Sequence, residues 1–171
     1  QWGLINIADE LRGVPIGLVN YSRNGRWDVE LSGDEAFPTM LALRTGTATF
    51  HSILGVAAHP DSQIKRWATV VGLGADIPVG RFPLGIDGLN YNVNEDEWWT
   101  DELHILNKLR ITLNLRLHDQ FSLFAGVTGN VLVSKLNDGS HLDMRNDALY
   151  DTKRDDVWVR IWPGVVAGMT F

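Results

Sequence analysis

Five charged residues stand within strand-like apolar segments, and their chemistry depends on what they face. They are Asp76, Asp87, Arg110, Arg116 and Arg160. Charged side chains on the inner face of a β structure are stable when opposite charges pair across the space that they share. We therefore predict that these five side chains meet in a narrow interior as a paired, structural network. The alternative, a polar lining that selects a solute, requires a wider interior.

Catalytic and cofactor motifs are weak in this chain. Some outer-membrane hydrolases use histidine, serine and a carboxylate, and His51-Ser52 is the nearest approach to such a pair. Adjacent residues of a strand point to opposite faces, so the two cannot readily act as nucleophile and base. The other histidines lack metal-site spacing, and Gly72-Leu-Gly74 leads to no helix that could complete a dinucleotide site. We expect no enzymatic activity, no cofactor and no metal.

Composition limits the remaining classes of function. The 171 residues include 15 basic and 21 acidic side chains, a net charge of -6, and no cysteine. No basic stripe could neutralise phosphates, so a nucleic-acid partner is not expected. The mean hydropathy is -0.07, and no apolar run approaches the length of a membrane-spanning helix. Gln1 begins the chain without an initiator Met, as in a mature form or a trimmed fragment.

Strict alternation identifies long strands that must position the charges. Residues 109–118 carry leucine or isoleucine at every second position, with polar residues between them. Tight turns are predicted at Gly80-Arg81 and Asp119-Gln120, and longer connections at 94–102 and 135–156. Strands of about 12 to 15 residues exceed the soluble norm, and short turns at one end with long loops at the other are typical of outer-membrane barrels.

A short repeat opens the chain. Gly3-Leu-Ile-Asn-Ile7 returns fourteen residues later as Gly17-Leu-Val-Asn-Tyr21. The two units could be arms of a hairpin or rungs of a solenoid, and two rungs are too few for a free-standing solenoid. We therefore predict a hairpin, followed by a turn-rich loop over residues 22–37 that includes a short strand at 27–31.

The last segment, Val157 to Phe171, alternates apolar residues and ends on an aromatic residue. It resembles the closing strand of Gram-negative outer-membrane β-barrel proteins, which the barrel-insertion machinery reads. The Gly-Leu-x-Asn units are similar to those of bacterial surface-repeat proteins, in which they precede such a barrel. The resemblance implies an outer-membrane location. Pro163 departs from the pattern, because proline removes a ladder donor and requires a bulge or a local break.

Aromatic residues near strand ends are candidates for membrane-interface anchors. They are Trp67, Trp98, Trp99 and Phe171. Aromatic side chains gather at the two borders of a membrane barrel, where one end of the ring system is apolar and the other meets water. For Trp98 and Trp99, which lie among acidic residues, a binding surface for an outside partner is the alternative.

These patterns predict one all-β domain over residues 1–171, an antiparallel up-and-down β-barrel of about 8–10 strands of the outer-membrane type. Residues 1–37 form the repeat hairpin and loop, and residues 38–171 form a regular strand meander. The predicted function is a non-enzymatic surface or structural protein of the cell outer membrane. Its partners are outer-membrane lipid and, as part of an envelope assembly, another envelope protein. The alternative is a soluble antiparallel β-barrel or sandwich that binds a ligand or protein partner.

The alternation makes a direct prediction for two adjacent residues. Leu113→Arg should lower the free energy of unfolding by about 2 to 4 kcal/mol, because it places a charge on the apolar face. Asn114→Arg should be tolerated much better, because that position lies on the polar face. Denaturant titration of the two variants measures the difference, and equal effects would mean that the faces are assigned wrongly.

Overall fold

The computed structural model describes residues 5–8, 17, 19–22, 25–60, 65–80, 82–95, 104–118, 120–135, 148–154 and 156–171. All regular secondary structure in these ranges is β. Within them, no helix is long and apolar enough to cross a membrane. The all-β class predicted from the alternation is confirmed.

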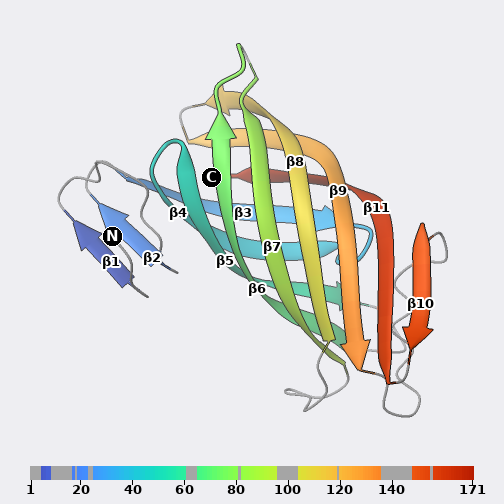
Figure 1. The fold of residues 1–171 in the computed structure, drawn as a ribbon. Coiled ribbons are helices and arrows are strands. Elements are labelled where there is room, and N and C mark those ends of the chain that lie inside the picture. The colour runs from blue at the N-terminus through green and yellow to red at the C-terminus, as the bar shows by residue number, and fades with distance from the viewer. Residues whose placement is uncertain are drawn as a thin grey trace.

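One antiparallel sheet contains nine strands, of which eight close into a ring (Figure 1). Seven strands follow one another in chain order, and β11 (Val157–Thr170) pairs with both β9 and β3, which closes the ring. β10 (Tyr150–Arg154) pairs with the first residues of β11, at its edge. The predicted up-and-down order is thereby confirmed. The seven strands are β3 (Arg26–Asp34), β4 (Thr39–Gly46), β5 (Phe50–Pro60), β6 (Lys65–Ile77), β7 (Leu84–Glu95), β8 (His104–His118) and β9 (Phe121–Lys135).

The ring is staggered. A walk along paired residues from Leu31 through all neighbouring strands arrives at Val159 on β11, whereas Leu31 itself pairs with Met169 of that strand. The mismatch is the ten residues from 159 to 169. With eight strands about 4.8 Å apart and a rise of about 3.3 Å per residue, this stagger tilts the strands by about 40° from the ring axis. The tilt is why the strands are long.

The first part of the ring differs from the sequence-based expectation. Residues 26–34, which we predicted to be mostly loop, form β3, and β10 lies inside the long connection predicted at 135–156. The glycines and charges of residues 22–37 resemble turn chemistry. In β3, however, Glu30 and Ser32 point inward while Val29 and Leu31 point outward. The charges therefore belong to the inner face of a strand.

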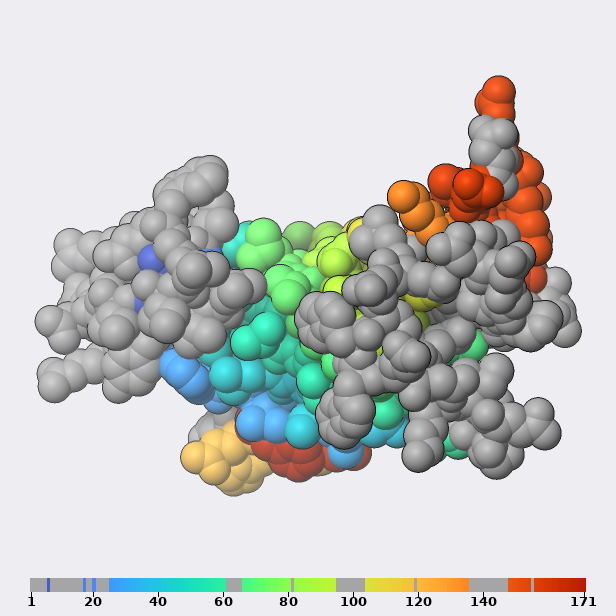
Figure 2. Space-filling view, turned by 90° about the horizontal axis from the view of Figure 1, so that it is seen from below, coloured from blue at the N-terminus to red at the C-terminus, as the bar shows by residue number. Residues whose placement is uncertain are grey.

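The repeat does not form the predicted hairpin. β1 (Ile5–Ala8) and β2 (Val19–Ser22) pair in parallel, with Asn6 beside Asn20, so the two units are stacked rungs. The amide of Asn6 donates to Asn20 Oδ1 at 2.9 Å, and the amide of Asn20 donates to Ser52 Oγ at 2.9 Å. The second rung therefore rests on the outer wall of the ring at β5. Figures 1 and 2 place β1 and β2 on one side of the ring and β10 on the opposite side.

Side chains fill the interior of the ring at the end with the long connections. The turn between β3 and β4 folds inward, so that Phe37 is fully buried and stacks on Tyr91 with ring centroids 5.5 Å apart. Around it lies an apolar core that includes Met40, Ile53, Val70, Leu89, Leu106, Leu132 and Trp162. The other half of the interior holds charged side chains, described below.

Pro163 lies where one edge of β11 pairs with no strand of the described residues. On that edge, β10 pairs with residues 157–161 and β3 pairs with residues 166–170, so Pro163 falls between them. The odd-numbered residues of β11 direct their backbone groups to this edge, as the bonds of Ile161 and Phe171 to Leu149 and Val29 indicate. On the other edge, pairing with β9 continues through Pro163 and Gly129. The local break predicted for Pro163 is confirmed.

Glu35 occupies this break. Its carboxylate accepts hydrogen bonds from the backbone N–H of Val165 at 3.0 Å, from Trp162 Nε1 at 3.1 Å and from Asn130 Nδ2 at 2.8 Å. Gly164 leaves room for it, because an added Cβ would overlap with the carboxylate. One side chain from the β3–β4 turn therefore replaces a missing strand and ties β3 to β11 and β9.

Removing this carboxylate should loosen the β3–β11 junction. Glu35→Ala leaves the Val165 N–H and Trp162 Nε1 without the acceptor that they share, and should lower the free energy of unfolding by about 2 to 4 kcal/mol. Amide hydrogen exchange should rise at residues 165–170 and 30–34 before it rises in β8 and β9. Asp151→Ala is the matched control, because Asp151 also accepts from an indole, that of Trp158, but at an exposed position. Equal exchange in both variants would contradict the role of Glu35.

Candidate functional site

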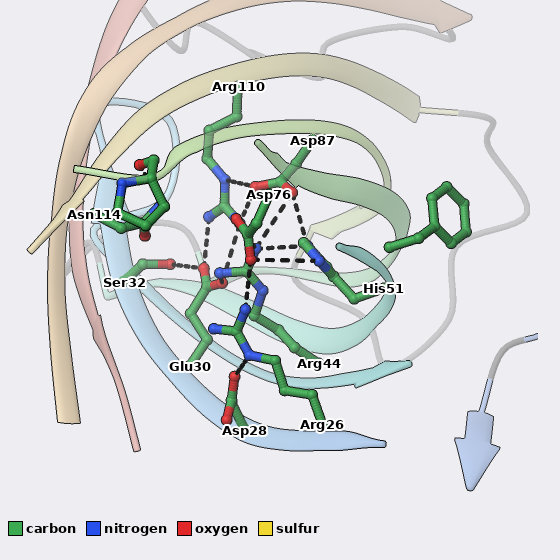
Figure 3. A network of polar contacts seen from close by, with 12 residues as sticks. Arg26, Asp28, Glu30, Ser32, Arg44, His51, Asp76, Asp87, Arg110 and Asn114 are labelled. Atoms are coloured by element: carbon green, nitrogen blue, oxygen red, sulfur yellow. Dashed lines mark hydrogen bonds and ion pairs between the residues drawn. The ribbon is translucent and has the colours of Figure 1, made fainter. Parts of the chain in front are cut away.

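Successive strands of the ring each contribute one inward-pointing polar side chain to a single cluster (Figure 3). Each of these residues alternates with an outward neighbour, so the period of the strand alone sends it into the interior. The stagger of the strands then brings the six side chains to about the same height along the ring axis. They are Glu30 of β3, Arg44 of β4, His51 of β5, Asp76 of β6, Asp87 of β7 and Arg110 of β8.

Arg110 joins the two sides of the interior. Its guanidinium donates to both oxygens of Glu30 at 2.5 and 3.0 Å, and its Nε donates to Asp87 Oδ2 at 2.9 Å. All three side chains are at most 1% exposed. Burial of an ion costs several kcal/mol unless its partners are well placed, so removal of one partner should be strongly destabilising.

Arg44 and His51 complete the buried part. Arg44 lies 3.5 Å from Glu30 Oε2 and 3.4 Å from Asp87 Oδ1. His51 Nε2 lies 2.9 Å from the same Asp87 oxygen and 2.5 Å from Arg44 Nη2. Each buried carboxylate thus contacts two or more donors, as the low dielectric of the interior demands.

The cluster extends to the mouth of the ring at the end with the short turns. Asp76 is bonded to Arg26 Nη1 at 2.5 Å, and Arg26 also pairs with Asp28. A cavity of about 210 Å³ opens beside Arg26, Asp76 and Arg116. Charges at this mouth are partly exposed, whereas Asp87 of β7 and Arg110 of β8 are fully buried. The side chains of the network are therefore partly exposed at the mouth and fully buried at the centre of the ring.

Glycines create the space that the charged side chains occupy. A Cβ added at Gly74 would overlap with Asp87 Oδ1 and His51 Nε2, and one added at Gly85 would crowd Thr112 Oγ1. The space that these glycines leave is occupied by the polar side chains of the neighbouring strands. Substitution at Gly74 would require the centre of the network to move.

The structure brings together three of the five residues predicted to form the network. Asp76, Asp87 and Arg110 meet as expected. Arg116 lies at the exposed end of β8. Arg160 lies on β11, with Nε 3.4 Å from Asp151 and its guanidinium over the Trp158 ring. The prediction that Arg116 and Arg160 belong to the network is therefore wrong. Both alternate in phase with the inward residues of their strands, but the stagger places them at other heights along the ring axis.

Sequence reasoning missed the network residues contributed by the first three ring strands. They are Arg26, Asp28, Glu30, Arg44 and His51. Arg44 and His51 lie in the strand meander predicted for residues 38–171, and β3 lies in the loop predicted for residues 22–37. Strict alternation of Asp28, Glu30 and Ser32 with Trp27, Val29 and Leu31 is the signal that could have identified them.

The predicted interface aromatics are only partly described. Trp98 and Trp99 lie outside the described residues. Trp67 is half-buried on β6. Phe171 is 51% exposed and packs against Phe121 with ring centroids 5.5 Å apart, at the end with the short turns.

His51 and Ser52, the pair considered from the sequence, are separated by the wall of the ring. His51 points inward while Ser52 points outward, where its hydroxyl donates to the carbonyl of Gly17, so the two side chains are not a nucleophile–base pair. No group of three potential metal ligands occurs in the described part of the chain. The chain matches no protein-family model, and no curated protein or solved structure is significantly similar to it. The site must therefore be interpreted from its own contacts.

Two arginines of β8 provide a matched test of the network. Arg110→Met removes the shared partner of Glu30 and Asp87 and should cost about 3 to 5 kcal/mol of unfolding free energy. Arg116→Met changes an exposed arginine of the same strand and should cost less than about 0.5 kcal/mol. Denaturant titration compares them. A small loss in Arg110→Met would mean that the network contributes little to stability.

Proposed function

We propose that the ring is an outer-membrane β-barrel with a structural or surface role. Its interior is filled with side chains, and the charged network there stabilises the closed ring. The observation that carries this proposal is the placement of polarity. Charges such as Glu30, Asp87 and Arg110 are buried inside, while leucine, valine and isoleucine side chains stand on the outer surface. A water-soluble β domain has the opposite arrangement.

The outer surface is apolar over several neighbouring strands. Leu113 is 57% exposed, Val127 is 58% exposed and Val165 is 66% exposed, and these residues lie on β8, β9 and β11. Soluble monomers seldom expose continuous apolar patches of this kind, because water contact with them is unfavourable. Hydrocarbon is the environment that would remove this cost.

The filled interior supports a structural role rather than conduction. In the described residues, the ionic network crosses one half of the interior, and Phe37, Tyr91 and the surrounding core fill the other. A ring of eight strands has room inside for little beyond its own side chains. The outward face thus becomes the functional surface, toward lipid and toward another envelope protein in an assembly.

Membrane fractionation and gel mobility test this proposal. The chain expressed with an export signal should remain in the outer-membrane fraction after a carbonate wash. It should also migrate faster on a denaturing gel before heating than after, because closed sheets of this type resist detergent unfolding. Reconstituted protein should give no steady conductance in a planar bilayer.

The soluble alternative predicts the opposite result. A folded, monodisperse protein without detergent, absent from the membrane fraction, would overturn the membrane proposal. The ring would then be a soluble β domain, and its exposed apolar surface would need a protein or ligand partner.

A further inference from the structure

The inner and outer faces of the ring exchange character along β6, β7 and β8. Near the short turns, Ile86 and Ile111 point outward while Asp87 and Arg110 point inward. Toward the long connections the pattern is reversed. There Thr69, Asn90, Asn92 and Asn107 point outward, and Val70, Leu89, Tyr91 and Leu106 point inward.

The outward polar residues form one patch. Asn90 pairs with Asn107 across β7 and β8, and their side chains share a hydrogen bond of 2.9 Å on the surface. Thr69 of β6 pairs with Asn92 of β7 in the next outward row. We call these four residues the asparagine patch. The polar residues therefore lie on three adjacent strands in two neighbouring rows, which also contain the outward side chains of Val71 and Ile105.

The apolar interior behind this patch is the second observation. Leu89, Tyr91 and Leu106 are 3% exposed or less and belong to the core around Phe37. The buried Lys108 beside them lies over the Tyr91 ring and is paired with Asp34. Polar outside and apolar inside is the arrangement of a β structure in water. The neighbouring half, with Ile111 outside and Arg110 inside, has the arrangement expected in hydrocarbon.

We propose that the edge of the hydrocarbon layer crosses β6–β8 between the Ile86–Ile111 row and the Asn90–Asn107 row. This inference rests on the proposed membrane function. The half of the ring toward the long connections then stands in water on this side, supported by its own apolar core. An uncovered carboxamide in hydrocarbon costs several kcal/mol, so the lipid surface ends where the asparagines begin. The outward faces of β9 and β11 stay apolar, so the edge rises toward them.

Spin labels on single cysteines test this boundary directly, because the chain has no cysteine of its own. The matched pairs are Ile86→Cys with Asn90→Cys on β7, and Ile111→Cys with Asn107→Cys on β8. Each labelled protein is reconstituted into phosphatidylcholine vesicles. The collision of the label with oxygen, which concentrates in hydrocarbon, is compared with its collision with a water-soluble nickel chelate.

The logarithm of the oxygen-to-nickel accessibility ratio should be positive at 86 and 111 and negative at 90 and 107. A positive value at all four positions would overturn the boundary while leaving the membrane proposal intact. A negative value at all four would overturn both. Variants that fail to fold are identified by loss of heat-modifiable migration. Asn92→Cys on β7 and Leu113→Cys on β8 then replace them, with a negative value expected at 92 and a positive value at 113.

Discussion

The interior of an eight-stranded ring is so narrow that every charge pointing into it must be neutralised by a side chain across the space. Arg110 meets this constraint by binding Glu30 and Asp87 together, with Arg44 and His51 beside them. The rest of the ring depends on this arrangement, because these contacts join β3 to the neighbouring strands β7 and β8, with which it does not pair. Glycines such as Gly74 are small because the charged groups need the volume.

Closure of the ring imposes a second condition at its junction. β3 is much shorter than β11, so part of β11 lacks a strand on one edge. Pro163 is compatible with that position because it has no N–H to leave unsatisfied. Val165 does have one, and Glu35 supplies the acceptor from the adjoining turn. Pro163 would conflict with hydrogen bonding along both edges of β11, but it is consistent with a strand that is paired at this position on one edge alone.

The two halves of the ring place polar and apolar side chains on opposite faces. One half places ions inside and apolar side chains outside, and the other places Leu89 and Tyr91 inside and Asn90 and Asn107 outside. The first arrangement is typical of a β structure in hydrocarbon and the second of a β structure in water. The proposed membrane position and the proposed boundary follow from this single contrast.

The sequence by itself determined the two-faced strands, because alternation is local: Leu113 and Asn114 must point to opposite sides, and the bounds of β8 and β9 agree with prediction. It also indicated Asp76, Asp87 and Arg110 as inward charges. Only the tertiary structure decided that Glu30, Arg44 and His51 join them, that Arg116 and Arg160 do not, and that the repeats stack in parallel. Those outcomes depend on stagger and closure, which set the level of each residue around the ring and leave no trace in the spacing along one strand.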